Sequence, residues 1–229
     1  MAPWFWQRLR PGLDPALAER VRRWRALPEP EGSRPPSTGR WVVLDVESSG
    51  LDASRDALIS VGAVAVSGGD VDIADSFEVV LRQPAPSTHA NIEVHGIGGV
   101  EQAGGAAPAH ALVAVLEFIG KDPLVAFHAP FDARMLQRAF HQHLGMTLRR
   151  PWLDLAELAP LAWPGRVPPR SGLDGWLQAL AIPMAFRHRA VVDCLATAQL
   201  LVAVQHEAPR LGVRTARALQ ALAGQRRWA

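Results

Sequence analysis

The stretch WVVLDVESSGL, residues 41–51, places two carboxylates inside a run of apolar, mostly β-branched residues. Such a run is typical of a buried strand, and side chains alternate across a strand. We therefore predict that Asp45 and Glu47 share one face and Leu44 and Val46 the other. Two like charges side by side are unfavourable unless a positive group lies between them. Mg²⁺ or Mn²⁺ would suit this pair of hard oxygen ligands, although a solvated edge position remains the alternative.

The composition suits one globular domain of ordinary size with extensions. The chain has 229 residues, of which 48% are hydrophobic and 20% are charged, and its formal net charge is +2. This mild excess does not by itself indicate a nucleic-acid-binding protein. Lys121 is the only lysine. The dominance of arginine either favours phosphate contacts or reflects codon usage.

The single cysteine and the distribution of apolar residues give an expectation about location. Because Cys194 is the only cysteine, neither an intrachain disulfide nor a cysteine zinc cluster can form. No stretch approaches the roughly 20 apolar residues of a membrane span. The N-terminus MAPWFWQRLRPGL is a poor match to a signal peptide. We expect a cytoplasmic protein without a membrane partner.

The apolar pattern predicts strands first and then strands alternating with helices. We expect strands at 41–47, on both sides of a tight turn at 67–70, at 123–127 and at 152–155. Residues 96–107 read as a loop. Helices are expected at 14–27, 108–119, 131–144, 171–180, 190–206 and 211–224, with Asp14 and Ser171 as N-caps of the first and fourth. This order indicates an α/β domain with a mixed sheet that begins with three antiparallel strands.

The same sequence pattern predicts that the chain is divided into three segments. Residues 1–38 form a helical extension that ends in the proline-rich linker PEPEGSRPPSTG, residues 39–207 form the main domain, and residues 208–229 form a helical tail. In the extension, Leu17, Val21, Trp24 and Leu27 are expected near one helix face. The aromatic residues Trp4, Phe5 and Trp6 are candidates to dock on the main domain, on a partner or on a membrane surface.

Two further motifs carry groups that can do chemistry. In FHAPFDARML, Asp132 follows a short apolar strand and lies at the start of a helix, where an ordinary first-turn aspartate is the alternative. In HRAVVD, residues 188–193, Asp193 lies in the first turn of a helix and small Ala190 leaves room beside it. His188 would be a candidate general base beside a carboxylate-metal cluster, and otherwise a surface or capping residue.

Together the motifs resemble the DEDD-type 3′–5′ exonucleases. LDVESSGLD is similar to the family's D-x-E-T-T-G-L, FHAPFD to H-N-A-x-F-D, and HRAVVD fits H-x-A-x-x-D completely. EVHGI, residues 93–97, is similar to I-H-G-I, and WLDLAEL, residues 152–158, to the D-T-L-x-L segment. The resemblance covers roughly residues 40–206 and implies a ribonuclease H-like fold with a mixed five-stranded sheet flanked by helices.

The chain resembles the histidine branch of this family, typified by the proofreading epsilon subunit of bacterial DNA polymerase III. The other branch uses a tyrosine in place of the histidine, and this chain contains no tyrosine. There are departures from the pattern. Phe127 and His128 stand where His-Asn is usual, Ser48 and Ser49 replace threonines, and Gly98 replaces a threonine. None of them removes an implied metal ligand.

The resemblance implies a role for each matching residue. Two divalent cations, Mg²⁺ or Mn²⁺, would be held by Asp45, Glu47, Asp132 and Asp193, and His188 would act as general base. Contacts to the 3′-terminal nucleotide are implied for Ser48, Gly50, Leu51, His95 and Phe131.

The implied function is removal of nucleotides from the 3′ ends of single-stranded nucleic acid, with DNA favoured. A DNA polymerase or another replication or repair protein is a candidate partner. Two alternatives stay open: a 3′–5′ exoribonuclease, and a non-catalytic nucleic-acid-binding accessory protein on the same fold.

Overall fold

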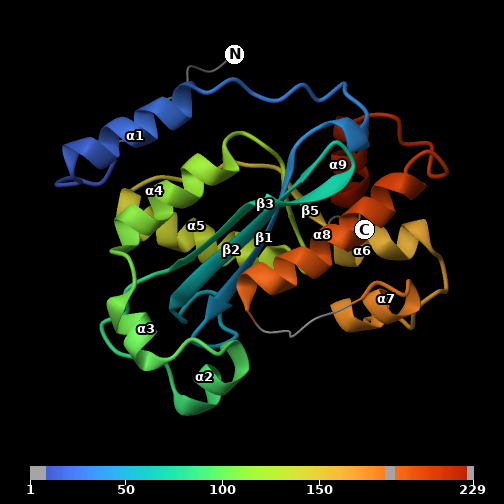
Figure 1. Cartoon of the computed structure of the whole chain (residues 1–229). Coiled ribbons are helices and arrows are strands. Elements are labelled where there is room, and N and C mark those ends of the chain that lie inside the picture. Colours follow the sequence, from blue (N-terminus) through green and yellow to red (C-terminus); the bar gives the residue numbers. More distant parts are fainter. Residues whose placement is uncertain (1–8, 184–188, 226–229) are drawn as a thin grey trace.

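The computed structural model describes residues 9–183 and 189–225 and is built around one mixed sheet. The strand order is β3-β2-β1-β4-β5 (Figure 1). The strands are β1 (Trp41–Ser48), β2 (Leu58–Ser67), β3 (Asp70–Val80), β4 (Leu124–Ala126) and β5 (Trp152–Asp154). The first three strands pair antiparallel, and β4 and β5 add in parallel. The predicted fold class is confirmed.

The antiparallel half of the sheet is set by the glycine turn between β2 and β3. Gly68 and Gly69 both have positive φ, at 63° and 82°. This conformation costs glycine little and suits a tight hairpin turn. The predicted turn is therefore confirmed. On the other side of β2, the register with β1 places Gly62 opposite Asp45.

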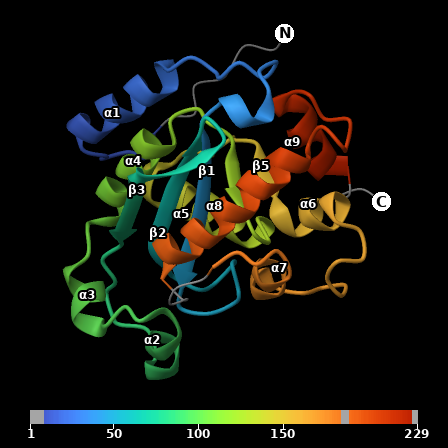
Figure 2. The ribbon, with the colours of Figure 1, turned by 45° about the vertical axis from the view of Figure 1, so that its right-hand side comes forward.

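Helices cover both faces of the sheet (Figures 1 and 2). The long helix α8 crosses one face, where α6, α7 and α9 also pack, and α1, α4 and α5 pack on the other face. The helices and the 3-10 turn are α1 (Pro15–Ala26), η1 (Pro36–Thr38), α2 (His89–His95), α3 (Gly99–Gly104), α4 (Pro108–Ile119), α5 (Pro130–Leu144), α6 (Leu155–Ala162), α7 (Leu173–Ala179), α8 (Ala190–Glu207) and α9 (Ala216–Gln225).

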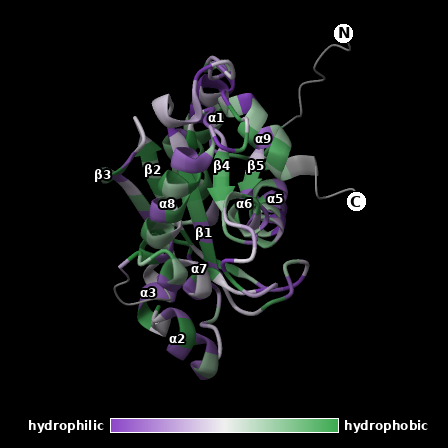
Figure 3. Ribbon diagram, turned by 90° about the vertical axis from the view of Figure 1, so that its right-hand side faces the viewer, coloured by the Kyte–Doolittle hydropathy of each residue, from purple (hydrophilic) through white to green (hydrophobic). Residues whose placement is uncertain are grey.

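The side chains of β1 alternate between two hydrophobic cores, one on each face of the sheet. Val42 and Leu44 belong to the cluster with α1, α4 and α5, whereas Trp41 and Val43 belong to the cluster with α8. Because both faces are covered, the central strands carry apolar residues almost continuously, and they appear hydrophobic in Figure 3. Asp45 continues the series of Trp41 and Val43 and so faces the α8 side.

Several element predictions need correction. Residues 96–107 were expected to be a loop, yet α3 lies there, with α2 just before it. Glycine and alanine richness suggested a loop, but short turns of helix form where buried side chains such as Gln102 anchor them. Ser171 does not cap α7, because Gly172 is the N-cap and the Ser171 hydroxyl donates to the carbonyl of Pro168. Helix α6 was missed, and the last helix begins at Ala216.

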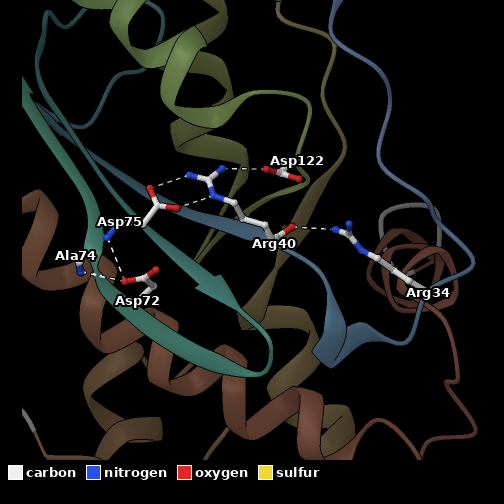
Figure 4. Close-up of polar contacts among 6 residues, drawn as sticks. All are labelled: Arg34, Arg40, Asp72, Ala74, Asp75 and Asp122. Atoms are coloured by element: carbon white, nitrogen blue, oxygen red, sulfur yellow. Dashed lines mark hydrogen bonds and ion pairs between the residues drawn. The ribbon is translucent and has the colours of Figure 1, made fainter.

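The segment before β1 is fixed at several points. The backbone N–H groups of Ala216 and Arg217 donate to the carbonyls of Arg34 and Gly32, at 2.8 and 3.0 Å. Arg34 also donates to the carbonyl of Arg40 at 2.9 Å (Figure 4). The proline-rich linker therefore runs along α9 at the edge of the domain. The proposed domain boundaries at 38 and 207 stay predictions.

Arg40 connects three parts of the fold at the start of β1. Its guanidinium donates to both carboxylate oxygens of Asp75 on β3, at 2.7 and 3.1 Å, and to Asp122 before β4, at 2.9 Å (Figure 4). It also lies 5.0 Å from the centroid of the Phe118 ring on α4. These contacts hold the start of β1, away from Asp45 and Glu47 in its second half. Across the described ranges, no helix combines the length and apolar character needed to cross a membrane.

Candidate active site

Three carboxylates converge at the C-terminal end of β1. Asp45 and Glu47 come from β1 and Asp193 from the first turn of α8, and each offers an oxygen within 4.8 Å of the others. Asp193 is buried, and Asp45 and Glu47 are half-buried. The common face predicted for Asp45 and Glu47 is consistent with this arrangement. Three hard oxygen donors gathered in this way fit a divalent cation such as Mg²⁺ or Mn²⁺.

The close approach of α8 to β2 brings Asp193 into this cluster. A Cβ atom on Gly62 would lie 2.4 Å from both the carbonyl carbon of Ala190 and the amide nitrogen of Val191. Only glycine permits this contact, and Ala190 is itself fully buried. Since Gly62 pairs with Asp45 across the sheet, the first turn of α8 rests beside the strand position that carries the first carboxylate.

Arg189 fixes the same end of α8 from outside. Its guanidinium lies 3.3 Å from Glu78 of β3 and 3.3 Å from Glu101 of α3. Its neighbour His188, the predicted general base, lies outside the described residues. The role of His188 therefore stays a prediction.

Asp132 is anchored to β1 beside the three converging carboxylates. It lies in the first turn of α5, is 4% exposed, and accepts a hydrogen bond from the backbone N–H of Val46 at 3.1 Å. Burial raises the pKa of Asp132 to about 8, with smaller contributions from the charges of Asp154 and Glu47, while backbone hydrogen bonds oppose the rise. A bound cation would favour the ionised carboxylate. Its role as a fourth ligand stays a prediction.

A broad groove runs along α5, the helix that carries Asp132. Leu51 and Phe131 both line it, together with Arg134 and Arg150, and its volume is about 1800 Å³. Leu51 is 94% exposed. An exposed leucine next to a half-buried phenylalanine offers an apolar surface on which a base could stack. The structure therefore brings these two predicted contact residues to one groove.

The turn after β1 is held by its own hydrogen bonds. The Ser48 hydroxyl donates to the carbonyl of Gly50 at 2.6 Å, and Ser49 bonds to Asp56 and to the N–H of Ala57. A Cβ on Gly50 would lie 2.5 Å from the Asp56 carboxylate. Ser48 and Gly50 thus shape the turn that presents Leu51, and their predicted contact with a nucleotide is untested.

His95 does not present its ring to the groove. It is 1% exposed, its Nδ1 accepts from the N–H of Ile97 at 3.0 Å, and its Nε2 lies 3.1 Å from the Asn91 side-chain oxygen. Both ring nitrogens are therefore occupied by the protein. The expected direct contact has no support in this conformation. The ring instead holds together the segment that contains α2 and α3.

Asp154 is a site residue that the sequence analysis left without a role. Its Oδ1 accepts from the N–H of His128 at 2.9 Å and from the N–H of Ala156 at 3.0 Å, and it is 8% exposed. His128 has a φ of 66°, a left-handed conformation in which asparagine and histidine are enriched. This explains how histidine can stand where the resembled family has asparagine. Asp154 is the aspartate of the WLDLAEL motif, so the resemblance of that motif to the D-T-L-x-L segment could have identified it.

Cys194 lies next to Asp193 and is fully buried. Burial raises the pKa of its thiol well above the ordinary value, and the carboxylates of Asp45, Asp132 and Asp193 raise it further. A thiol in this environment stays protonated and is a poor nucleophile. The chemistry of the site therefore belongs to the carboxylates.

Comparison with known proteins agrees with this geometry. Residues 42–201 match the model of the RNase_T family, described as exonuclease. The chain is 32% identical over 174 residues to the DNA polymerase III PolC-type protein of Bacillus subtilis and 28% identical over 173 residues to that of Thermotoga maritima. Each match covers 76% of this chain, but the chain spans only 12% of the length of either relative.

Solved structures show the same fold. Exonuclease X in complex with 5′ overhanging duplex DNA superposes with a TM-score of 0.62 at 21% identity, over 80% of this chain and 99% of that one. E. coli Exonuclease I in complex with a dT13 oligonucleotide gives 0.61 at 20% identity, over 76% and 43%. Cell-death related nuclease 4 gives 0.65 at 14% identity, over 80% and 67%. With a ribonuclease H-like fold and a match over residues 42–201, this chain belongs to the exonuclease family.

Proposed function

We propose that this chain is a metal-dependent 3′–5′ exonuclease that removes nucleotides one at a time from single-stranded DNA. The observation that carries the proposal is the convergence of oxygens from Asp45, Glu47 and Asp193 within 4.8 Å of one another. Family membership and the exonucleases among the solved structures support the same reaction class.

In this proposal the carboxylates set the position of the reaction. Asp45, Glu47 and Asp193 would hold a pair of Mg²⁺ or Mn²⁺ ions, with Asp132 completing the set from α5. When bound, such ions activate an attacking water and stabilise the leaving 3′-oxygen. His188 would accept the proton from that water, which requires a neutral imidazole. Activity should therefore rise from mildly acidic to alkaline pH, and a profile flat across this range would remove His188 from the role.

The groove along α5 supports a substrate without sequence preference. Leu51 and Phe131 offer apolar contact to a base, and the exposed Arg134 supplies a positive charge on the same groove, whereas Arg150 is paired with Glu29. Stacking and phosphate contacts of this kind tolerate any base. DNA is favoured because the curated relatives are DNA polymerases of the PolC type. For the same reason, a DNA polymerase is the partner that we would test first.

Substitution of Asp45 tests the proposal. Wild-type protein should shorten 5′-labelled single-stranded DNA from its 3′ end only when Mg²⁺ or Mn²⁺ is present. Asp45→Ala should lower the rate at least about 100-fold, because it removes an oxygen from the centre of the cluster. Asp70→Ala, at an exposed turn, is the matched control and should retain the wild-type rate.

The outcome also separates the alternatives. If the wild type trims nothing, or if Asp45→Ala trims as fast as the wild type, the catalytic assignment is wrong and an accessory binding role takes its place. The same assay on 5′-labelled RNA decides between the deoxyribonuclease and the exoribonuclease. Binding of either strand without trimming would point to the accessory protein.

A further inference from the structure

A second cavity lies on the opposite face of the sheet from the carboxylate cluster. Its volume is about 560 Å³, within the range of small-molecule sites. It lies between α5 and the segment 82–87, and its apolar wall includes Leu58, Leu81 and Met135. These residues belong to the core beneath α4 and α5, whereas Asp45 follows the face of Val43 beneath α8. The cavity is thus distinct from the carboxylate cluster, although it shares Arg138 with the groove along α5.

The charges around this cavity are of one sign. Arg55, Arg82 and Arg138 line it, and no aspartate or glutamate is among the described residues that do so. Asp52, which does not line the cavity, lies 3.8 Å from Arg55, and its charge also interacts with that of Arg138. Clustered arginines without an acidic lining give a positive potential inside a concave site and attract anions.

Arg82 and Arg138 hydrogen-bond to backbone carbonyls, and Arg138 also contacts the sulfur of Met135 at 3.7 Å. Arg82 donates to the carbonyl of Gly105 at 3.1 Å. Arg138 donates to the carbonyls of Arg55 and Asp56, and its buried Nε has no hydrogen-bond partner among the described residues. Neither forms an ion pair with any described carboxylate side chain. Both guanidinium groups therefore keep their positive charge without a carboxylate partner within ion-pair distance, and phosphate is a favourable partner for such a group.

We propose that this cavity binds a mononucleotide, with its phosphate on Arg82 and Arg138 and its base against the apolar wall. The side-chain amides of Gln83, Gln102 and Gln142, which also line the cavity, can bond to base edges. That the anion is a nucleotide rests on the proposed function, since a nucleoside 5′-monophosphate is the product of such an exonuclease. That the cavity holds a phosphate rests only on its own arginines.

Calorimetric titration of the full chain in EDTA tests this site. Without divalent cations the carboxylate cluster repels a phosphate, so binding there is suppressed. Thymidine 5′-monophosphate should bind, and Arg82→Gln should weaken its affinity about tenfold, the worth of one charge-assisted hydrogen bond. Arg138→Gln should act in the same direction, but because Arg138 lines the groove along α5 as well, Arg82→Gln is the variant that assigns the site. Arg23→Gln, at an exposed position on α1, is the matched control and should bind as the wild type does.

Titrations with other ligands test whether the bound anion is a mononucleotide. Inorganic phosphate should bind more weakly than the mononucleotide at the same site, because it lacks the base. Equal affinity for both would overturn the nucleotide assignment. A short single-stranded oligonucleotide that binds while the mononucleotide does not would also overturn it.

Location is decided by comparing the variants. Loss of binding in Arg134→Gln but not in Arg82→Gln would place the nucleotide in the groove along α5 and overturn the proposal. Absence of binding to wild-type protein would overturn it as well. Neither result depends on trimming activity, so the failure of this site and the failure of the proposed function are separable.

Discussion

At the scale of single residues, His95 gives a pH dependence that is independent of the carboxylate cluster. Burial lowers the pKa of His95 from its ordinary value of 6.5, and the charge of Glu101 opposes this only in part. Its Nδ1 accepts the N–H of Ile97. Protonation would place a second hydrogen between these nitrogens, so the neutral ring is the one that fits.

The sign of the effect follows from the lowered pKa. In the unfolded chain His95 takes up a proton near pH 6.5, whereas in the folded segment protonation requires a lower pH. The stability that the neutral ring contributes is therefore present above about pH 6.5 and is lost as the pH falls below that value. Hydrogen-exchange protection factors of residues 87–102 should fall between pH 7.5 and 5.5. His95→Gln should remove most of this pH dependence, and the exposed control His89→Gln should keep it. Protection that stays constant in the wild type would contradict the prediction.

The identity of the chemical groups could be read from the sequence, but their environment could not. Alternation along a strand placed Asp45 and Glu47 on one face, and helix-start chemistry placed Asp132 and Asp193 in first turns. The burial of the His95 ring was not predictable, because it depends on contacts with Asn91 and Ile97 that only the folded segment creates. The role of Asp154 was missed for the same reason, since its partner His128 is 26 residues away.

At the scale of elements, the contact between β2 and α8 decides where Asp193 lies. Gly62→Ala would drive a methyl group into the backbone at Ala190 and Val191, which must then move. We expect a loss of about 1–3 kcal/mol in the free energy of unfolding, as for overpacking in a core. A displacement of Asp193 by about 1 Å should also lower the trimming rate about 100-fold.

Gly104→Ala is the control for this change, because no atom lies within 4 Å of the added Cβ and its φ is not positive. Urea unfolding and trimming of labelled single-stranded DNA measure the two effects. If Gly62→Ala retains the wild-type rate while it loses stability, the first turn of α8 does not position the cluster. Mn²⁺-dependent stabilisation should be weaker in Gly62→Ala than in Gly104→Ala, which links the defect to the carboxylates.

Strong local signals account for the elements that the sequence predicted well. The glycine turn at 68–69, the proline at the start of α4 and the long apolar run of β2 each determine local structure with little help from distant residues. Helices α2 and α3 are short, and the buried side chains of His95 and Gln102 hold them in place. Local composition cannot reveal such tertiary contacts.

At the scale of the whole molecule, the sequence predicted a mixed sheet but not how the extensions join it. Trp24 was expected on one helix face, and the structure buries it in the core with α4. Its Nε1 donates to the carbonyl of Gly120 at 2.7 Å, and the Lys121 ammonium lies 3.8 Å from the centroid of its ring. A helix that reads as an appendage in sequence therefore shares the domain's core, because the sequence shows an apolar face but not its partner.

Substitution of Trp24 tests whether α1 is part of the cooperative fold. Trp24 is 6% exposed, and truncation of such a buried aromatic residue costs about 3–5 kcal/mol. Trp24→Ala should lower the free energy of unfolding in urea by that amount, in one transition. Leu27→Ala, at a position that is 44% exposed, is the control and should change it by less than about 0.5 kcal/mol.

Catalysis should respond differently from stability. Trp24 contacts the α4–β4 connection, and the backbone N–H of Val42, near the start of β1, donates to Pro123 in that connection. Asp45 and Glu47 lie towards the other end of β1, which ends at Ser48. Well below its unfolding temperature, Trp24→Ala should therefore trim DNA at the wild-type rate. A helix docked in the common core must unfold together with that core. If Trp24→Ala leaves the stability unchanged, or if α1 unfolds in a separate early transition, residues 1–38 behave as an independent extension.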